Sequence, residues 1–148
     1  MPILAVNKRA RFDYEILEKL EAGLVLSGAE VKSVRQGSAS LKGAFVSFRG
    51  KEAFLTNATI PRYRFSNPEL PYDASSSRKL LLRKKEIAYL TGKKSEEGLT
   101  IVPLSLYTSG RTIKVGLGVG RGKKQRDKRE TIKRRDVHRE LRRKMKGQ

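Results

Sequence analysis

The 148-residue chain contains no cysteine and only one histidine, His138. Without cysteine, disulfides, thiolate metal sites and thiol nucleophiles are all excluded. No apolar run approaches the roughly 18 residues that a membrane helix needs. The segment ILAV near the start is too short for the apolar core of a signal peptide. We therefore expect a cytoplasmic protein with no contact to a membrane.

Acidic residues are scarce relative to basic ones. The chain has 34 Lys and Arg against 15 Asp and Glu, a formal net charge of +19 at pH 7. Residues 1–119 hold 20 basic and 11 acidic side chains, whereas residues 120–148 hold 14 and 4. Half of the net charge therefore lies in the last fifth of the chain, and such a charge distribution is typical of proteins that bind polyanions.

The length and the 37% hydrophobic content are sufficient for one globular domain and an appendage. We expect a folded domain over residues 1–120 and a basic tail over residues 121–148. The apolar side chains after Gly120 are Ile132, Val137, Leu141 and Met145. They bury too little surface to offset the loss of backbone entropy, so the tail is predicted to be disordered alone and helical once phosphates neutralise its cations.

The segment DYEILEKLEAGLVL, residues 13–26, has apolar side chains at positions of one parity, a pattern interrupted by Glu18. They are Tyr14, Ile16, Leu20, Ala22, Leu24 and Leu26. A period of two is typical of a strand with one buried face, so these residues are predicted to form one long, curved strand.

Two short helices are predicted from local signals. Ser27 and Glu30 have the spacing of a capping box, which indicates a helix over residues 28–35. The segment RKKEIAYLTG, residues 83–92, places two apolar residues three positions apart, and Gly92 is expected to end the second helix.

Two antiparallel hairpins are predicted. In residues 44–58 two apolar runs flank Gly50 and Lys51, a connection that suits a tight turn, and residues 99–119 form a second such pair. Residues 60–79 are rich in Pro, Ser and Asn and indicate a long loop. About five strands arriving as hairpins favour a mainly β fold, a small closed antiparallel barrel of the oligonucleotide-binding type.

The string GLGVGRGKK resembles a phosphate-binding loop of nucleotide-binding proteins. Such a loop needs a glycine five positions before its GK pair and a Ser or Thr after it, but Leu117 and Lys124 occupy those positions. We therefore interpret this string as the end of a strand, where glycines avoid steric crowding, and not as a nucleotide site.

Other candidates for chemistry are weak. Glu96 and Glu97 are interpreted as part of a solvated turn, and Asp13 and Glu15 as the exposed face of a strand, with no histidine beside either pair. His138 is interpreted as a solvated tail residue rather than a general base, because no apolar pocket surrounds it. We expect no catalytic residue, no metal and no cofactor.

The segment IPRYRF alternates cationic and aromatic side chains at Arg62, Tyr63, Arg64 and Phe65. This pattern can stack on bases and contact phosphates. In a chain with only five Tyr and five Phe, packing of Tyr63 or Phe65 in the core is equally compatible with the sequence. Both interpretations stay open.

Five segments in order give the chain a close resemblance to one family. They are VNKRARFDYEI, EAGLVLSGAEVKS, RKLLL, LSLY and GRGKKQRDKR. Together they resemble the SmpB family of bacterial proteins, partners of transfer-messenger RNA, from about Val6 to Arg129. The resemblance implies a closed barrel of the oligonucleotide-binding type, a basic tail that is unstructured in the free protein, and no enzymatic activity.

The resemblance also implies partners. A member of this family binds the transfer-RNA-like part of transfer-messenger RNA and helps to deliver it to the stalled 70S ribosome, where translation resumes on a new reading frame. Elongation factor Tu would be contacted indirectly, through the charged RNA, and the protein itself is expected to be a monomer.

Matching the family motifs position by position implies roles for individual residues. Asn7, Glu21 and Leu81 match positions linked to RNA binding. The tail positions needed on the ribosome are Lys123, Lys124, Asp127, Lys128 and Arg129. The chain departs from the family at Arg126, where many members have His, although arginine can also stack on bases.

These assignments have physical counterparts and alternatives. Glu21 would accept hydrogen bonds from base or ribose donors, while Asn7 would contact a base edge or cap a helix, and Leu81 would pack on an unstacked base or in the core. The basic side chains of the barrel that are expected to hold phosphates are Lys8, Arg9, Lys32 and Arg35. A generic ribosomal or single-strand RNA-binding protein is the second hypothesis, and a ribonuclease the third.

Overall fold

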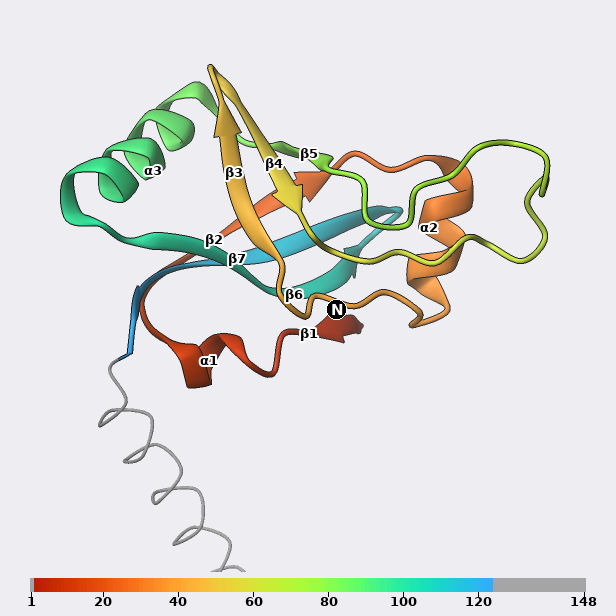
Figure 1. Ribbon diagram of the computed structural model, residues 1–148, viewed down its shortest axis with the longest axis horizontal. Coiled ribbons are helices and arrows are strands. Elements are labelled where there is room, and N and C mark those ends of the chain that lie inside the picture. The colour runs from red at the N-terminus through yellow and green to blue at the C-terminus, as the bar shows by residue number, and fades with distance from the viewer. Residues whose placement is uncertain (1, 124–148) are drawn as a thin grey trace, which may run out of the picture.

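The structure is a computed structural model that describes residues 2–123. Its elements are β1 (Ile3–Val6), α1 (Ala10–Asp13), β2 (Tyr14–Leu24), α2 (Gly28–Arg35), β3 (Phe45–Arg49), β4 (Glu52–Thr56), β5 (Arg78–Leu81), α3 (Lys84–Glu97), β6 (Thr100–Ser109) and β7 (Thr112–Gly122). All strands pair antiparallel in one sheet of order β1-β6-β7-β2-β5-β4-β3 (Figure 1). The mainly β, antiparallel prediction is confirmed, while the predicted tail beyond Lys123 lies outside the described residues.

The sheet curls around one core, but its two edges do not pair. β3 packs against β6, yet within residues 2–123 β1 pairs only with β6 and β3 only with β4. β1 and residues 37–42 instead line a hollow of about 710 Å³. The expected closure of the barrel is therefore not confirmed, because the hydrogen-bonded ladder is open between β1 and β3.

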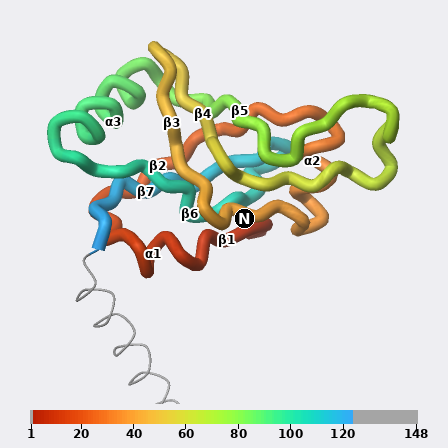
Figure 2. Tube along the Cα trace, in the orientation of Figure 1, coloured from red at the N-terminus to blue at the C-terminus, as the bar shows by residue number. Residues whose placement is uncertain are grey.

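Two helices cover opposite ends of the curled sheet. Figure 2 shows α2 beside the long loop between β4 and β5 at one end, and α3 at the other. Each helix inserts a side chain with no exposed surface into the core, Val34 from α2 and Leu90 from α3. Burial of such a side chain contributes about 1.5–3 kcal/mol, so the helices also stabilise the curl.

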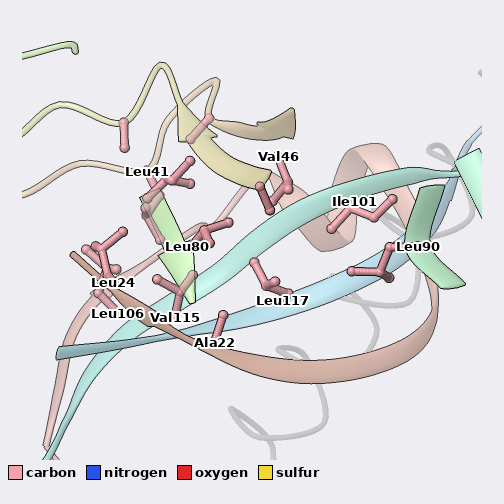
Figure 3. Packing of buried hydrophobic residues seen from close by; sticks show 14 of the residues in the cluster. Ala22, Leu24, Leu41, Val46, Leu80, Leu90, Ile101, Leu106, Val115 and Leu117 are labelled. Atoms are coloured by element: carbon pink, nitrogen blue, oxygen red, sulfur yellow. The ribbon is translucent and has the colours of Figure 1, made fainter. Parts of the chain in front are cut away.

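The core lies between the inner faces of the strands (Figure 3). Strand residues in this cluster include Ala22, Leu24, Val46, Leu80, Ile101, Leu106, Val115 and Leu117. Alternation along β7 buries Val115, Leu117 and Val119 and directs the intervening residues outward. The second predicted hairpin, β6–β7, is thus confirmed, as is the first, β3–β4, with its turn at Gly50 and Lys51.

β2 contains a bulge that the parity of its sequence does not reveal. Ile16 pairs with Gly120 and Glu18 with Val119, so Leu17 is an extra residue in this strand. A bulge reverses the alternation. Consequently Tyr14 and Ile16 lie on the outer face, and the prediction that all apolar residues of this strand share one buried face is wrong.

The glycines of β7 make room for those outer-face side chains. An added Cβ at Gly118 would lie 3.2 Å from both Ile16 Cγ2 and Leu104 Cδ1. At Gly120 it would lie 3.1 Å from Tyr14 Cβ. These glycines belong to a strand and permit close packing across it, as expected for a glycine-relieved strand rather than a nucleotide loop.

Local signals predict α2 well and α3 only in part. In α2, Ser27 Oγ accepts from Glu30 N–H at 3.2 Å and Glu30 Oε1 accepts from Ser27 N–H at 3.0 Å, the expected capping box. The predicted end of α3 at Gly92 is wrong, because a glycine inside a helix costs only about 1 kcal/mol. α3 continues to Glu97 and ends at Gly98, whose φ of 65° is favourable for glycine.

That extension, together with α1, places three acidic residues in helices. Glu96 and Glu97 form the last turn of α3 rather than a separate turn, and Asp13 ends α1 rather than sharing a strand with Glu15. Four-residue strands β1 and β5 were not predicted, and β5 takes its first two residues from the expected loop.

Arg78 links the sheet to the loop of residues 61–77, which is called the 61–77 loop below. Arg78 is 4% exposed and forms an ion pair with Glu30 of α2, with 2.9 Å between Nη2 and Oε2. Arg78 Nη1 also donates at 2.8–3.0 Å to the backbone carbonyls of Ala58, Ala74 and Ser76. One side chain therefore joins α2, the chain after β4 and the loop.

Candidate nucleic-acid interface

Glu21 lies in β2 on the outer face of the sheet, opposite the core. Its register partner on β7 is Gly116, so no side chain stands beside it there. Tyr107 Oη of β6 donates to Glu21 Oε2, and Lys114 Nζ of β7 lies 3.5 Å from Glu21 Oε1. The Glu21 side chain keeps 57% of its surface exposed. A carboxylate is thus held in place and still open to a ligand.

The neighbours of Glu21 control its ionisation. The hydrogen bond from Tyr107, followed by the charge of Lys114, lowers the pKa of Glu21 below its ordinary value. Burial, followed by the hydrogen bond to Glu21, raises the pKa of Tyr107 to about 12. Near neutral pH the carboxylate is therefore a charged acceptor, and the phenol is a protonated donor that orients it.

Replacing Tyr107 by Phe should raise the pKa of Glu21 toward its ordinary value of 4.5, because the largest cause of the lowering is removed. When folding lowers the pKa of a carboxyl group, the charged carboxylate stabilises the folded protein at pH values above the unfolded-state pKa. This stabilisation is lost as the pH falls through the folded-state pKa. With Tyr107→Phe, the free energy of unfolding should therefore fall less steeply as the pH is lowered through this range. Carboxyl-carbon NMR titration of Glu21 checks this, with Tyr89→Phe as a control at a different carboxylate, and an unshifted Glu21 would contradict it.

Leu81 lies on the same outer face as Glu21. It pairs with Gly23 across β2 and β5, and an added Cβ at Gly23 would lie 3.3 Å from Leu81 Cδ1. Because Glu21 and Gly23 are two residues apart in β2, their outward directions are the same. Leu81 is 58% exposed, so the interpretation as a core residue is wrong. The structure thus brings two of the predicted RNA-binding residues together.

Asn7 anchors the segment between β1 and α1. Its Nδ2 donates to Pro103 O at 2.9 Å and its backbone N–H to Leu104 O at 2.8 Å, next to a bulge in β6. The N-cap of α1 is Arg9, which makes no side-chain cap hydrogen bond. The interpretation of Asn7 as a helix cap is therefore wrong, and its side chain fixes the backbone that presents Lys8.

A basic groove adjoins Glu21. Asn7, Lys8 and Arg11 line one part of it and Lys19 of β2 another, around a hollow of about 380 Å³. Gly116, the register partner of Glu21, also lines this hollow, so the groove and the carboxylate are neighbours. Three cations around a hollow of this size can hold the phosphates of an RNA strand.

The remaining basic candidates of the barrel lie in two places. Arg9 lines the hollow between β1 and residues 37–42, with its Nη2 3.5 Å from Asp13 Oδ1 and its guanidinium over the Phe12 ring. Lys32 and Arg35 lie on α2, where Lys32 Nζ is 5.5 Å from the centre of the Tyr63 ring. The predicted phosphate-binding set therefore does not form one continuous patch.

Of the predicted ribosome-binding residues, Lys123 lies at the end of the described chain. Its backbone N–H donates to Asp13 O at 2.9 Å, which places the start of the predicted tail beside α1. The predicted tail residues outside the described range are Lys124, Arg126, Asp127, Lys128 and Arg129, and His138 lies there too. Their assignments stay predictions.

Sequence reasoning missed four residues of this interface: Tyr107, Lys114, Arg11 and Lys19. Tyr107 is separated from Glu21 by 86 positions, and only the register of β2, β7 and β6 brings them together. A signal existed for Lys114, since the buried alternation of residues 113–119 predicts that it faces outward.

Residues 2–123 offer neither a metal site nor a membrane-spanning helix. No group of three or more His, Asp or Glu in this range could hold a metal ion. None of the helices there is long and apolar enough to cross a membrane.

Comparison with known proteins decides the family. A family model described as SmpB protein matches residues 4–147. The SsrA-binding proteins of Mesoplasma florum and Coprothermobacter proteolyticus are each 51% identical over 144 residues, which cover 97% of this chain and 97% and 96% of those proteins. The chain belongs to the SmpB family. The SsrA-binding protein of Thermosynechococcus vestitus is 49% identical over 97% of this chain and 95% of its own length.

A solved structure of the SmpB family has a similar fold. It is presented as "tmRNA-SmpB: a journey to the center of the bacterial ribosome", and it matches with a TM-score of 0.67 and 44% identity. The match covers 86% of this chain and 92% of that chain. The antiparallel sheet with a few helices is therefore shared with an SmpB protein.

Proposed function

We propose that this protein is an RNA-binding adaptor that binds the transfer-RNA-like domain of transfer-messenger RNA and delivers it to stalled ribosomes for trans-translation. The observation that carries the proposal is the oriented Glu21 carboxylate beside the exposed Leu81 and the basic groove, in a chain related to SsrA-binding proteins. It works in the cytoplasm as a monomer, without catalysis or a cofactor, and meets elongation factor Tu only through the charged RNA.

The chemistry of the outer face fits structured RNA. A fixed carboxylate repels phosphates, so its place beside a basic groove favours contact with a base amino group or a ribose hydroxyl. Leu81 offers an apolar surface to an unstacked base, while Lys8, Arg11 and Lys19 hold the neighbouring phosphates. We infer that the curled sheet acts as a barrel of the oligonucleotide-binding type with an open seam between β1 and β3.

Replacing Glu21 by Ala should weaken binding to a transcribed transfer-RNA-like domain about tenfold or more, because a hydrogen bond to a charged group is lost. The salt dependence should keep its slope, since no phosphate contact is removed. Titrations at several salt concentrations measure both quantities. Glu52→Ala, which removes the same charge from an exposed side chain at the start of β4, is the matched control and should bind as the unchanged protein does.

The same titrations separate the alternatives. A generic single-strand binder would prefer an unstructured RNA of equal length to the folded domain, and a ribonuclease would shorten the RNA during the assay. If Glu21→Ala and Glu52→Ala bind equally well, Glu21 is not at the interface.

A further inference from the structure

The 61–77 loop carries aromatic and cationic side chains that the interface around Glu21 does not use. We propose that Phe65 is a second contact site for transfer-messenger RNA, at which an unpaired nucleotide of the transfer-RNA-like domain stacks while Lys32 and Arg64 hold its phosphates. This inference rests on the proposed function and adds a separate surface to it.

Phe65 is presented to solvent. It is 67% exposed, the highest value among the large hydrophobic side chains of residues 2–123, so the interpretation of Phe65 as a core residue is wrong. The Tyr63 ring meets it edge-on at 5.5 Å between ring centres, and the Arg64 guanidinium lies 4.5 Å from the centre of the ring. An exposed aromatic ring with a cation beside it is the arrangement on which bases stack.

The loop that carries Phe65 is held by its own hydrogen bonds. Arg62 donates from Nη1 to Asn67 O at 2.9 Å and from Nη2 to Leu70 O at 2.7 Å. Ser66 Oγ donates to Tyr63 O at 2.6 Å, so the residue that follows Phe65 is fixed as well. Because the loop is already ordered, stacking on Phe65 does not require the loop to be ordered first.

Charge around Phe65 favours a polyanion. Lys32 Nζ lies 5.5 Å from the Tyr63 ring, and Arg64 adjoins Phe65 itself. The acidic side chains Glu30 and Asp73 line a hollow that Tyr63 shares but that Arg64 and Phe65 do not line. Glu30 of α2 is engaged by Arg78. Aromatic rings interleaved with cations suit a nucleic-acid strand better than an apolar protein surface.

The position of the loop favours transfer-messenger RNA over the ribosome. The loop and α2 lie at one end of the molecule, whereas β7 ends at Gly122 beside α1 at the opposite end (Figure 2). The predicted ribosome-binding tail begins at that opposite end. An adaptor that joins two partners can thus offer its two ends to different RNAs.

Phe65→Ala in the full chain should weaken binding to a transcribed transfer-RNA-like domain by about five- to a hundredfold, the loss expected for one stacked base. The salt slope should stay unchanged, whereas Lys32→Ala should reduce it by about one. Leu70→Ala is the matched control, because Leu70 is a 60% exposed residue of the same loop without an aromatic ring. Unchanged binding by Phe65→Ala overturns the inference, as does a loss confined to 70S ribosomes.

The absence of tryptophan in the chain allows a direct observation of stacking. Phe65→Trp should retain binding, and the emission of this single tryptophan should be quenched as the transfer-RNA-like domain is added. Leu70→Trp, the control, should keep its emission. Equal quenching of both, or of neither, overturns the inference. If the unchanged protein itself fails to bind this RNA, the proposed function fails, so the two failures are distinguishable.

Discussion

Replacing Arg78 by Ala should lower the free energy of unfolding by about 3–5 kcal/mol, the range for breaking a buried ion pair. The change leaves Glu30, whose side chain is only 13% exposed, without its cation. It also removes the donor to the carbonyls of Ala58, Ala74 and Ser76. Because domains of this size are stable by only about 5–15 kcal/mol, one substitution should remove a large part of the total.

Urea unfolding followed by circular dichroism measures this effect, and the melting temperature should fall by roughly 10 °C or more. Arg111→Ala, at an exposed arginine of the β6–β7 turn, is the control and should stay within about 0.5 kcal/mol. Glu30→Gln added to Arg78→Ala should restore little, since the three carbonyls still lack the hydrogen bonds from Arg78. A loss below about 1 kcal/mol for Arg78→Ala would show that the network is not a main support of the loop.

Removing the residues after Lys123 should abolish peptide tagging on stalled ribosomes while leaving binding to the transfer-RNA-like domain nearly intact. The removed segment holds 12 of the 34 basic side chains, and none of the residues around Glu21 or Phe65. The cut follows Lys123 because β7 runs to Gly122, and Lys123 N–H bonds to Asp13 O. Tag addition on ribosomes stalled at a message end, run beside RNA titrations, measures both activities.

A smaller change tests the same division of labour. Replacing Asp127, Lys128 and Arg129 together by Ala should mimic the truncation, since the bound tail is expected to use them as a helix cap and two phosphate contacts. Replacing Gly147 and Gln148 serves as the control and should change little. Normal tagging by the truncated protein, or RNA binding that falls in step with tagging, would refute a separate role for the tail.

Sequence predicted those parts of the fold that local chemistry determines. α2 was placed correctly because its capping box uses residues three positions apart. β1 and β5 were missed because four residues carry no period of their own, and pairing with distant strands defines them. The parity of β2 was misleading because the bulge at Leu17 turns Tyr14 and Ile16 to the outer face, where they pack over the glycines of β7.

The candidate site also contains residues that the sequence identified and residues that only the three-dimensional structure reveals. Glu21, Leu81 and Asn7 were identified through the family resemblance, but residues alone left Asn7 and Leu81 open between structural and RNA-contacting roles. The structure assigns Asn7 an anchoring contact to β6 and leaves Leu81 exposed. The contact of Tyr107 with Glu21 could not be predicted from the sequence, because it depends on the register of three strands.

The position of β7 between two long strands has a mechanical consequence. β7 is paired with β2 on one side and β6 on the other along nearly its whole length, and the chain leaves it at Gly122. Hydrogen bonds of an antiparallel ladder run perpendicular to the strands. Tension applied beyond Lys123 along the axis of β7 therefore loads both ladders in shear, so that many bonds resist together instead of opening one after another. The sheet would thus resist a pull along β7 better than the same pull applied across an edge strand.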